Sequence, residues 1–171
     1  MKFQTLRMSS ILLTGLIAGT FFYGGLTVLP AFFDVNPYVH LTFRTILMKY
    51  NAPVVMTLVI IAIVSQTLYS WQARKINVAR VFVWLSLALT ISSLLITRIL
   101  SVPINIVIKT WNPSSPPADW MNIMVTWNVY NTIRTFTAIG SFLLIIIADF
   151  WIIKKYENQK TLPVDSGKQT L

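Results

Sequence analysis

Three residue types that could bind an anion recur at helical spacing in the last third of this chain. Trp127, Asn131 and Arg134 are separated by four and three residues, and Trp120 and Met124 continue the same pattern toward the N-terminus. Side chains three and four residues apart lie on one face of a helix. A guanidinium and a carboxamide on such a face can donate hydrogen bonds to an oxyanion, so this face is the first candidate for a binding or catalytic site.

A second polar stripe precedes it, since Arg98, Ser101 and Asn105 are also three and four residues apart. We expect Arg98 and Arg134 to lie at the same end of the molecule, where the two stripes could face each other. Two arginines beside one cavity repel each other unless an anion or a carboxylate joins them. Asn105 and Asn131 either form hydrogen bonds inside a pocket or satisfy backbone groups at helix ends.

Other conventional catalytic groups are scarce. His40 is the only histidine and there is no cysteine, so we expect neither a metal site nor thiol chemistry. No phosphate loop, dinucleotide fingerprint or nucleophile elbow is present, and we expect no cofactor. His40 is either a general base or an ordinary loop residue, and Trp111 is either an interfacial anchor or part of a pocket wall.

The elements that must position these residues are four long apolar segments. Only 11% of the residues are charged and the mean hydropathy is +0.66. Residues 8–30, 53–71, 80–101 and 131–153 each approach the roughly 20 residues that a helix needs to cross a membrane. The sequence predicts an all-α integral membrane four-helix bundle (residues 1–155) with a long polar outer loop between the third and fourth helices. We expect residues 156–171 to form a disordered cytoplasmic tail.

The first apolar segment has two interpretations. Lys2 and Arg7 resemble the basic start of a signal peptide. The segment nevertheless continues past the usual length of a signal peptide core, and Gly15 and Gly19 have the spacing of a helix-packing motif. We therefore expect a retained membrane span, with a cleaved signal peptide as the alternative.

The net charge of +9 is explained by membrane topology rather than by nucleic acid. In a four-span arrangement most Lys and Arg residues fall on the side of the two termini and the 72–79 loop. Positive residues favour the cytoplasm, so we expect both termini to be cytoplasmic. Membrane lipid and a small aromatic or anionic ligand are the expected partners, no nucleic acid is expected, and the oligomeric state stays open.

Several short motifs resemble the anthrone-oxygenase-like family of small four-span membrane proteins. They are Pro103-Ile-Asn105, Trp111-Asn-Pro113 and Trp127-x-x-x-Asn131-x-x-Arg134-Thr135. The resemblance covers roughly residues 10–153 in order and spacing. Many relatives have Trp and His in the stretch where this chain has Tyr130 and Asn131.

The resemblance implies oxidation of a polyketide anthrone to an anthraquinone by molecular oxygen, and the sequence permits a version of this reaction without a cofactor. Such a reaction needs an apolar slot for a flat tricycle, donors at an oxyanion and a base. We expect the slot at Met124, Trp127 and Phe136, the donors at Arg98, Asn105, Asn131 and Arg134, and the base at His40.

A different class of protein remains open from the same residues. A non-enzymatic membrane protein could bind a lipid, a quinone or a partner protein through the same outer cavity. That hypothesis suits the scarcity of acid–base groups. A channel or transporter is less favoured, because the four segments carry few polar residues at mid-depth.

Overall fold

The computed structural model describes residues 3–73 and 77–160, and all elements in these ranges are helical. They are α1 (Phe3–Tyr23), η1 (Gly24–Val28), α2 (Leu29–Phe33), α3 (Pro37–Gln72), α4 (Asn77–Ile96), η3 (Thr97–Ser101), α5 (Val102–Ile108) and α6 (Trp120–Lys160). Within these ranges, four continuous helical stretches are long and apolar enough to cross a membrane. The predicted all-α membrane bundle is confirmed.

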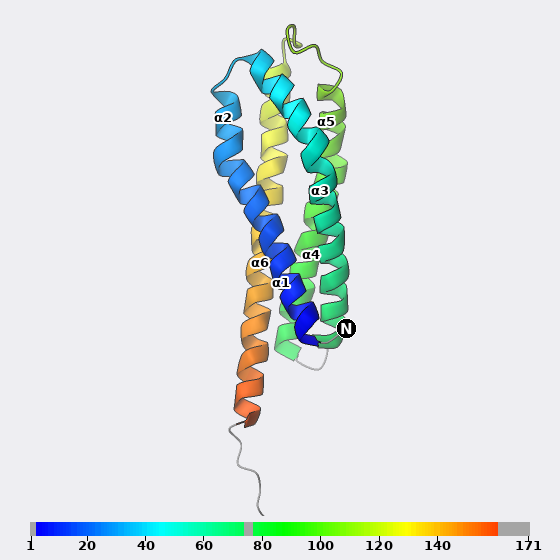
Figure 1. Ribbon diagram of the computed structural model, residues 1–171, viewed down its shortest axis with the longest axis vertical. Helices are drawn as coiled ribbons and strands as arrows, with labels where there is room; N and C mark the ends of the chain where they lie inside the picture. The colour runs from blue at the N-terminus through cyan, green and yellow to red at the C-terminus, as the bar shows by residue number, and fades with distance from the viewer. Residues whose placement is uncertain (1–2, 74–76, 161–171) are drawn as a thin grey trace, which may run out of the picture.

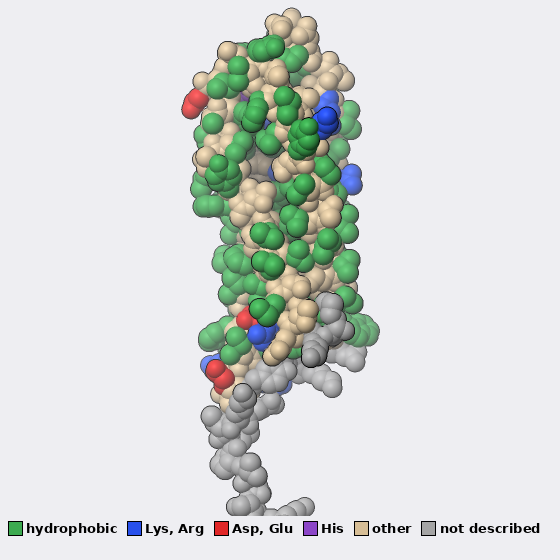
Figure 2. All heavy atoms as spheres, in the orientation of Figure 1, with side chains coloured by type: hydrophobic (Ala, Val, Ile, Leu, Met, Phe, Trp, Pro, Cys, Tyr) green, Lys and Arg blue, Asp and Glu red, His purple; other side chains and the backbone are tan. Residues whose placement is uncertain are grey.

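The four stretches run alongside one another, and α1 begins at the same end of the bundle at which α6 finishes (Figure 1). We call this end the terminal end. The opposite end, which carries residues 34–36 and 109–119, is called the loop end. Large apolar side chains such as Phe22, Phe136 and Phe150 are 52%, 69% and 60% exposed. In the space-filling view, apolar side chains cover much of the visible face (Figure 2), as expected for a surface in contact with lipid.

The second helix begins earlier than the sequence predicts. We expected a span from residue 53 and a long loop before it, but α3 begins at Pro37 and passes through Pro53. The side chain of Asn36 caps this helix by accepting a hydrogen bond from the Val39 backbone N–H at 2.9 Å. Proline inside a membrane helix is tolerated because neighbouring groups satisfy the freed carbonyl. The helix therefore extends before the predicted span, and residues 37–52, which we expected in a loop, lie on it.

The fourth helix also exceeds its predicted span at both ends. It begins at Trp120 and continues to Lys160. The helix therefore begins before residue 131, where the predicted span starts. The first five residues of the predicted disordered tail, 156–160, belong to α6, whereas residues 161–171 lie outside the described residues.

Two π-helical turns interrupt the helices close to the loop end. One, η1, precedes Pro30, and the other, η3, precedes Pro103. A proline cannot donate to the carbonyl four residues earlier, and its ring clashes with that carbonyl. We attribute the wider turns to relief of this clash, and π-helical turns occur frequently at functional sites.

Only part of the predicted glycine packing face is in close contact. A Cβ atom placed on Gly15 would lie 3.0 Å from the Phe142 ring, whereas one on Gly19 would meet nothing within 4 Å. Near the terminal end, Arg7 and Asp149 join α1 to α6 through an ion pair of 2.7 Å. Close approach at Gly15 and this ion pair therefore fix α1 against α6.

Candidate functional site

The candidate site lies at the loop end, where α3 contributes a histidine and an arginine. His40 and Arg44 are 1% and 4% exposed. They are four residues apart, so both project from the same face of α3. The early start of α3 at Pro37 is what places them inside the bundle. Buried ionisable residues in a membrane protein normally face the bundle interior and mark a functional position.

Each of two arginines lies over an aromatic ring. The guanidinium carbon of Arg44 is 3.9 Å from the centroid of the Trp127 ring, and that of Arg134 is 4.2 Å from the centroid of Phe21. Arg134 also donates a hydrogen bond from Nη2 to the Oδ1 atom of Asn131. Cation–π contacts of this kind orient a guanidinium and leave its edge free to donate hydrogen bonds.

No carboxylate in the described part of the chain neutralises these two arginines. Their charges are close enough to repel each other. Asp34 and Asp119, the acidic residues nearest the loop end in sequence, are exposed, and neither forms an ion pair with an arginine of the site among the described residues. A pair of buried like charges is costly unless an anion joins them.

The site is rich in unused hydrogen-bond donors. Buried nitrogen atoms without a hydrogen-bond partner are Nε and Nη2 of Arg44, Nε of Arg134 and Nε1 of Trp127. All four carry hydrogen and none can accept a hydrogen bond. Buried donors are nearly always satisfied in proteins, so these four indicate a ligand that supplies acceptor oxygens.

The His40 ring is enclosed by aromatic side chains. Phe32 is stacked on it at 5.2 Å between ring centroids, and Phe33 and Trp120 meet it edge-on at 5.7 and 5.5 Å. The backbone of Phe32 lies close enough to interact with the ring, but neither ring nitrogen makes a hydrogen bond of good geometry. His40 therefore keeps a nitrogen free to exchange a proton with a ligand.

Next to the histidine, an apolar cluster closes the loop end. Leu41, Ile108 and Met124 form its buried centre, with Trp111 and Trp120 packed against it. These residues come from α3, α5, α6 and the connection between α5 and α6. The cluster gives the site one dry, rigid wall, typical of pockets for small apolar ligands.

Open space borders the arginines on the side of η1. A Cβ atom on Gly25 would meet only the Thr135 Oγ1 atom, at 4.0 Å, and one on Gly24 would meet nothing within 4 Å. Phe21 contacts Arg134, and the Cβ position of Gly25 approaches Thr135, so both residues face α6. Figure 2 shows a hollow in the upper part of the visible face, toward the loop end. A flat ligand could therefore lie between η1 and α6.

Most of the predicted site residues meet at this end. His40, Met124, Trp127, Asn131 and Arg134 are connected through the contacts described above. Trp111 belongs to the apolar wall. Asn105 is half-buried on α5, and its buried Oδ1 atom has no hydrogen-bond partner.

Two predicted site residues lie elsewhere. Arg98 is exposed, so the expected pairing of Arg98 with Arg134 is replaced by that of Arg44 with Arg134. The π turn η3 changes the helical register between Arg98 and Ser101, which leaves Ser101 1% exposed and turns Arg98 outward. Phe136 is 69% exposed. It follows Arg134 by two residues, which places it on the opposite face of α6.

Sequence reasoning missed two members of the site, Arg44 and Phe21. The predicted span begins at residue 53, which leaves Arg44 in the loop before it. The signal that could have found it is the four-residue spacing from His40, together with Asn36 and Pro37 as a helix start. Phe21 has no comparable signal, because it is one of many apolar residues in its helix.

Comparison with known proteins gives one match. The profile of the family described as anthrone oxygenase matches residues 43–144, which is more than half of the 171-residue chain. The match includes Arg44, Trp127, Asn131 and Arg134 and excludes His40. No curated protein and no solved structure matches the chain.

Proposed function

The chain belongs to the anthrone oxygenase family, and we propose that it is a membrane-embedded oxygenase acting on an anthrone-type aromatic with molecular oxygen. The observation that carries this proposal is the set of buried N–H donors on Arg44, Trp127 and Arg134 that have no acceptor. An anthrone that has lost a proton carries its negative charge on the carbonyl oxygen. Such an oxyanion would accept these hydrogen bonds and offset the repulsion between the two guanidinium groups.

The proposed reaction needs no bound cofactor. A base removes a proton from the methylene carbon opposite the anthrone carbonyl, and the resulting anion passes one electron to O2. The two radicals combine at that carbon, and protonation gives a hydroperoxide. Loss of water then leaves the second carbonyl. One oxygen atom of O2 enters the quinone and the other leaves as water.

In this proposal, the protein contributes preorganised charge. The rings of Trp127 and Phe21 support the guanidinium groups of Arg44 and Arg134, and Asn131 holds Arg134 through its side-chain oxygen. The donors are therefore oriented before the ligand arrives, which is how electrostatic stabilisation of an anionic transition state becomes effective.

We assign the proton acceptor to His40. It is buried beside Arg44, and both of its ring nitrogens lack a hydrogen bond of good geometry. A neutral imidazole can accept the methylene proton at physiological pH.

The substrate is proposed to lie between η1 and α6. The proposal is supported by Gly25, which has no side chain to fill this region and whose Cβ position approaches only Thr135, and Met124 with its neighbours is proposed as the apolar end of the slot. A flat hydrophobic molecule dissolved in the membrane could reach this slot without crossing a polar surface.

The test is oxygen consumption together with quinone formation. Purified protein in detergent is given emodin anthrone, and both rates are compared with the spontaneous rates in the same detergent. The proposal expects one O2 consumed for each quinone formed, well above the spontaneous rate. Tight binding of the anthrone without acceleration would instead support the other candidate, a non-enzymatic membrane protein that binds an aromatic ligand through this site.

We also propose that the site opens on the non-cytoplasmic side of the membrane. Basic residues are concentrated at the terminal end. Because the natural chain has no cysteine, single substitutions Gln4→Cys and Ser115→Cys can be compared in intact cells. A membrane-impermeant maleimide should label only the protein with cysteine at position 115. Labelling of position 4 alone would reverse the assignment.

A further inference from the structure

A layer of polar side chains crosses the middle of the bundle, away from the candidate site. Ser86 on α4 and Ser141 on α6 are linked by hydrogen bonds at 2.8 and 2.9 Å, and Thr90 reaches the hydroxyl of Ser141 at 2.7 Å. Gln66 on α3 donates to Ser86 at 3.2 Å. All four residues are buried. Polar side chains at this depth in a membrane bundle are rare and normally serve packing or function.

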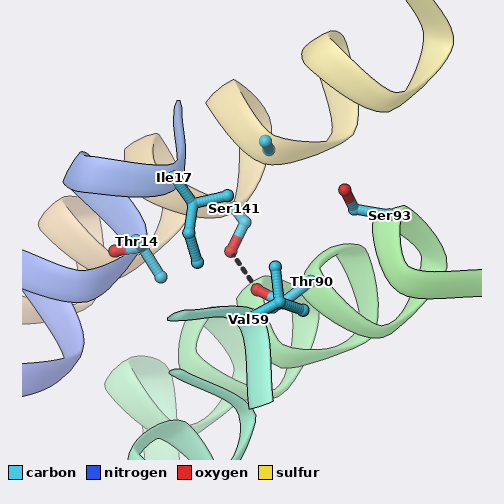
Figure 3. A pocket seen from close by; sticks show the side chains of 7 residues that line it. Thr14, Ile17, Val59, Thr90, Ser93 and Ser141 are labelled. Carbon is cyan, nitrogen blue, oxygen red and sulfur yellow. Dashed lines mark hydrogen bonds between the residues drawn. The ribbon is translucent and has the colours of Figure 1, made fainter. Parts of the chain in front are cut away.

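A small cavity adjoins this layer. Its volume is about 10 Å³, and its walls come from all four long helices. Figure 3 shows Thr90 and Ser141 sharing a hydrogen bond beside it, the Thr14 hydroxyl turned toward its own helix, and the apolar side chains of Ile17 and Val59 in the wall. The lining residues are Thr14, Ile17, Val59, Thr90, Ser93, Ala138 and Ser141. About 10 to 15 Å³ is the space that one water molecule requires.

One of the lining hydroxyls has no hydrogen-bond partner. Ser93 is 2% exposed, and its Oγ atom makes no hydrogen bond with any group of the described protein. A buried hydroxyl without a partner is unfavourable and uncommon. An acceptor for the Ser93 proton is therefore missing at the wall of a cavity that has room for one water.

We propose that this cavity binds one ordered water molecule. Ser93 donates its hydroxyl proton to the water. Thr90, which shares a hydrogen bond with Ser141, offers an acceptor oxygen. The water thus has two polar partners, Ser93 and Thr90, both on α4, which is within the usual range for a buried water.

The lining excludes other small ligands. It carries no charged side chain, so an ion would lose its hydration shell without compensation. An apolar gas atom or ring would need a larger space and would leave the Ser93 hydroxyl unsatisfied. Water is the one common species that matches both the volume and the hydrogen-bonding pattern. Through Thr90 the water links Ser93 to the Ser86–Ser141 layer, and it does not depend on the proposed oxygenase activity.

Radiolytic hydroxyl labelling of the full-length protein in detergent tests this directly. X-rays convert bound water into hydroxyl radicals that modify adjacent side chains, and mass spectrometry locates the products. We expect Ile17 and Val59, each 4% exposed, to be labelled at least several-fold faster than Ile145 and Ile152, which are 0% exposed and belong to a different apolar cluster. Equal labelling of the two sets would overturn the proposal.

The substitution Ser93→Ala gives an independent test, because a hydrated cavity and a dry cavity predict opposite changes in melting temperature. If Ser93 binds a water, removal of the Ser93 hydroxyl leaves that water poorly satisfied beside Thr90, and the melting temperature should fall by about 2 to 6 °C. If the cavity is dry, the substitution removes an unsatisfied hydroxyl, and the melting temperature should rise. Ser92→Ala is the matched control, because Ser92 is half-buried on the same helix and does not line the cavity, and its hydroxyl donates to the carbonyl of Ala88.

Discussion

The guanidinium group of Arg44 lies 3.9 Å above the ring of Trp127, and donor nitrogens of both residues are buried without an acceptor. Arg44 comes from the second membrane helix and Trp127 from the fourth. Their contact joins two helices through a charged group that has no carboxylate partner among the described residues. Packing alone gives no reason for a charge at this position, since a leucine or methionine would fill the same space at lower cost.

The first prediction concerns this contact. Arg44→Lys keeps the positive charge but loses the planar group that stacks on Trp127 and donates from several edges. We expect turnover to fall by about tenfold, equivalent to the 1–2 kcal/mol of a desolvated cation–π contact. Steady-state rates of quinone formation measure the change. Wild-type turnover in Arg44→Lys would show that the charge alone suffices.

Much of this site could be predicted from the sequence, because several of its residues lie on one face of a single helix. Trp127, Asn131 and Arg134 recur at the spacing of an α-helical face, and the structure joins Arg134 to Asn131 by a hydrogen bond. Periodicity reports the face of a single element well. The same argument could have rejected Phe136, which is two residues from Arg134 and therefore on the far side of α6.

The remaining parts depended on features that periodicity does not report. The start of α3 depends on the Asn36 cap and on a helix that continues through Pro53, so Arg44 was assigned to a loop. The outward position of Arg98 depends on a π-helical turn. Such turns arise from local strain between backbone and proline. The pairing of Arg44 with Arg134 depends on how two separate helices pack, which the periodicity of either helix alone does not report.

His40 should act as the base and not only as a packing residue. His40→Gln keeps a polar side chain but cannot accept a proton at neutral pH, so turnover should fall by about 100-fold or more. His40→Phe preserves the aromatic packing with Phe32 and Trp120 and should be equally inactive while retaining the wild-type melting temperature. Exchange of the anthrone methylene protons with deuterated solvent, measured without oxygen, reports the step directly. Undiminished exchange in His40→Gln would assign the proton transfer to another group.

Space beside Gly25 should be needed by the substrate and not by the fold. Gly25→Leu would fill the region between η1 and α6, and we expect KM to rise by about tenfold or more, as for other steric losses in a pocket. Gly19→Leu is the matched control, because a Cβ atom there meets nothing within 4 Å and Gly19 is exposed, whereas a Cβ atom on Gly25 approaches Thr135 of α6. Equal effects of the two substitutions would argue against a slot at Gly25.

Gly15 should matter for stability. Its missing side chain allows the Phe142 ring to approach to 3.0 Å of the Cβ position. Gly15→Leu should overpack this contact by about 1–3 kcal/mol and lower the melting temperature by about 3 to 10 °C. Gly19→Leu serves again as the control and should melt within about 2 °C of the wild type. A larger loss at Gly19 than at Gly15 would contradict the packing described for α1.

The measurement that tests the central claim most directly is turnover of emodin anthrone by three proteins: the wild type, Arg134→Met and Arg98→Met. Arg134 belongs to the buried donor set, whereas Arg98 carries the same charge on the exposed surface. We predict a loss of about 100-fold or more for Arg134→Met, the usual effect of removing an oxyanion donor. Arg98→Met should remain within about twofold of the wild type, since exposed charges contribute little. Equal turnover in all three proteins, each folded, would contradict the assignment of the site to the buried arginines.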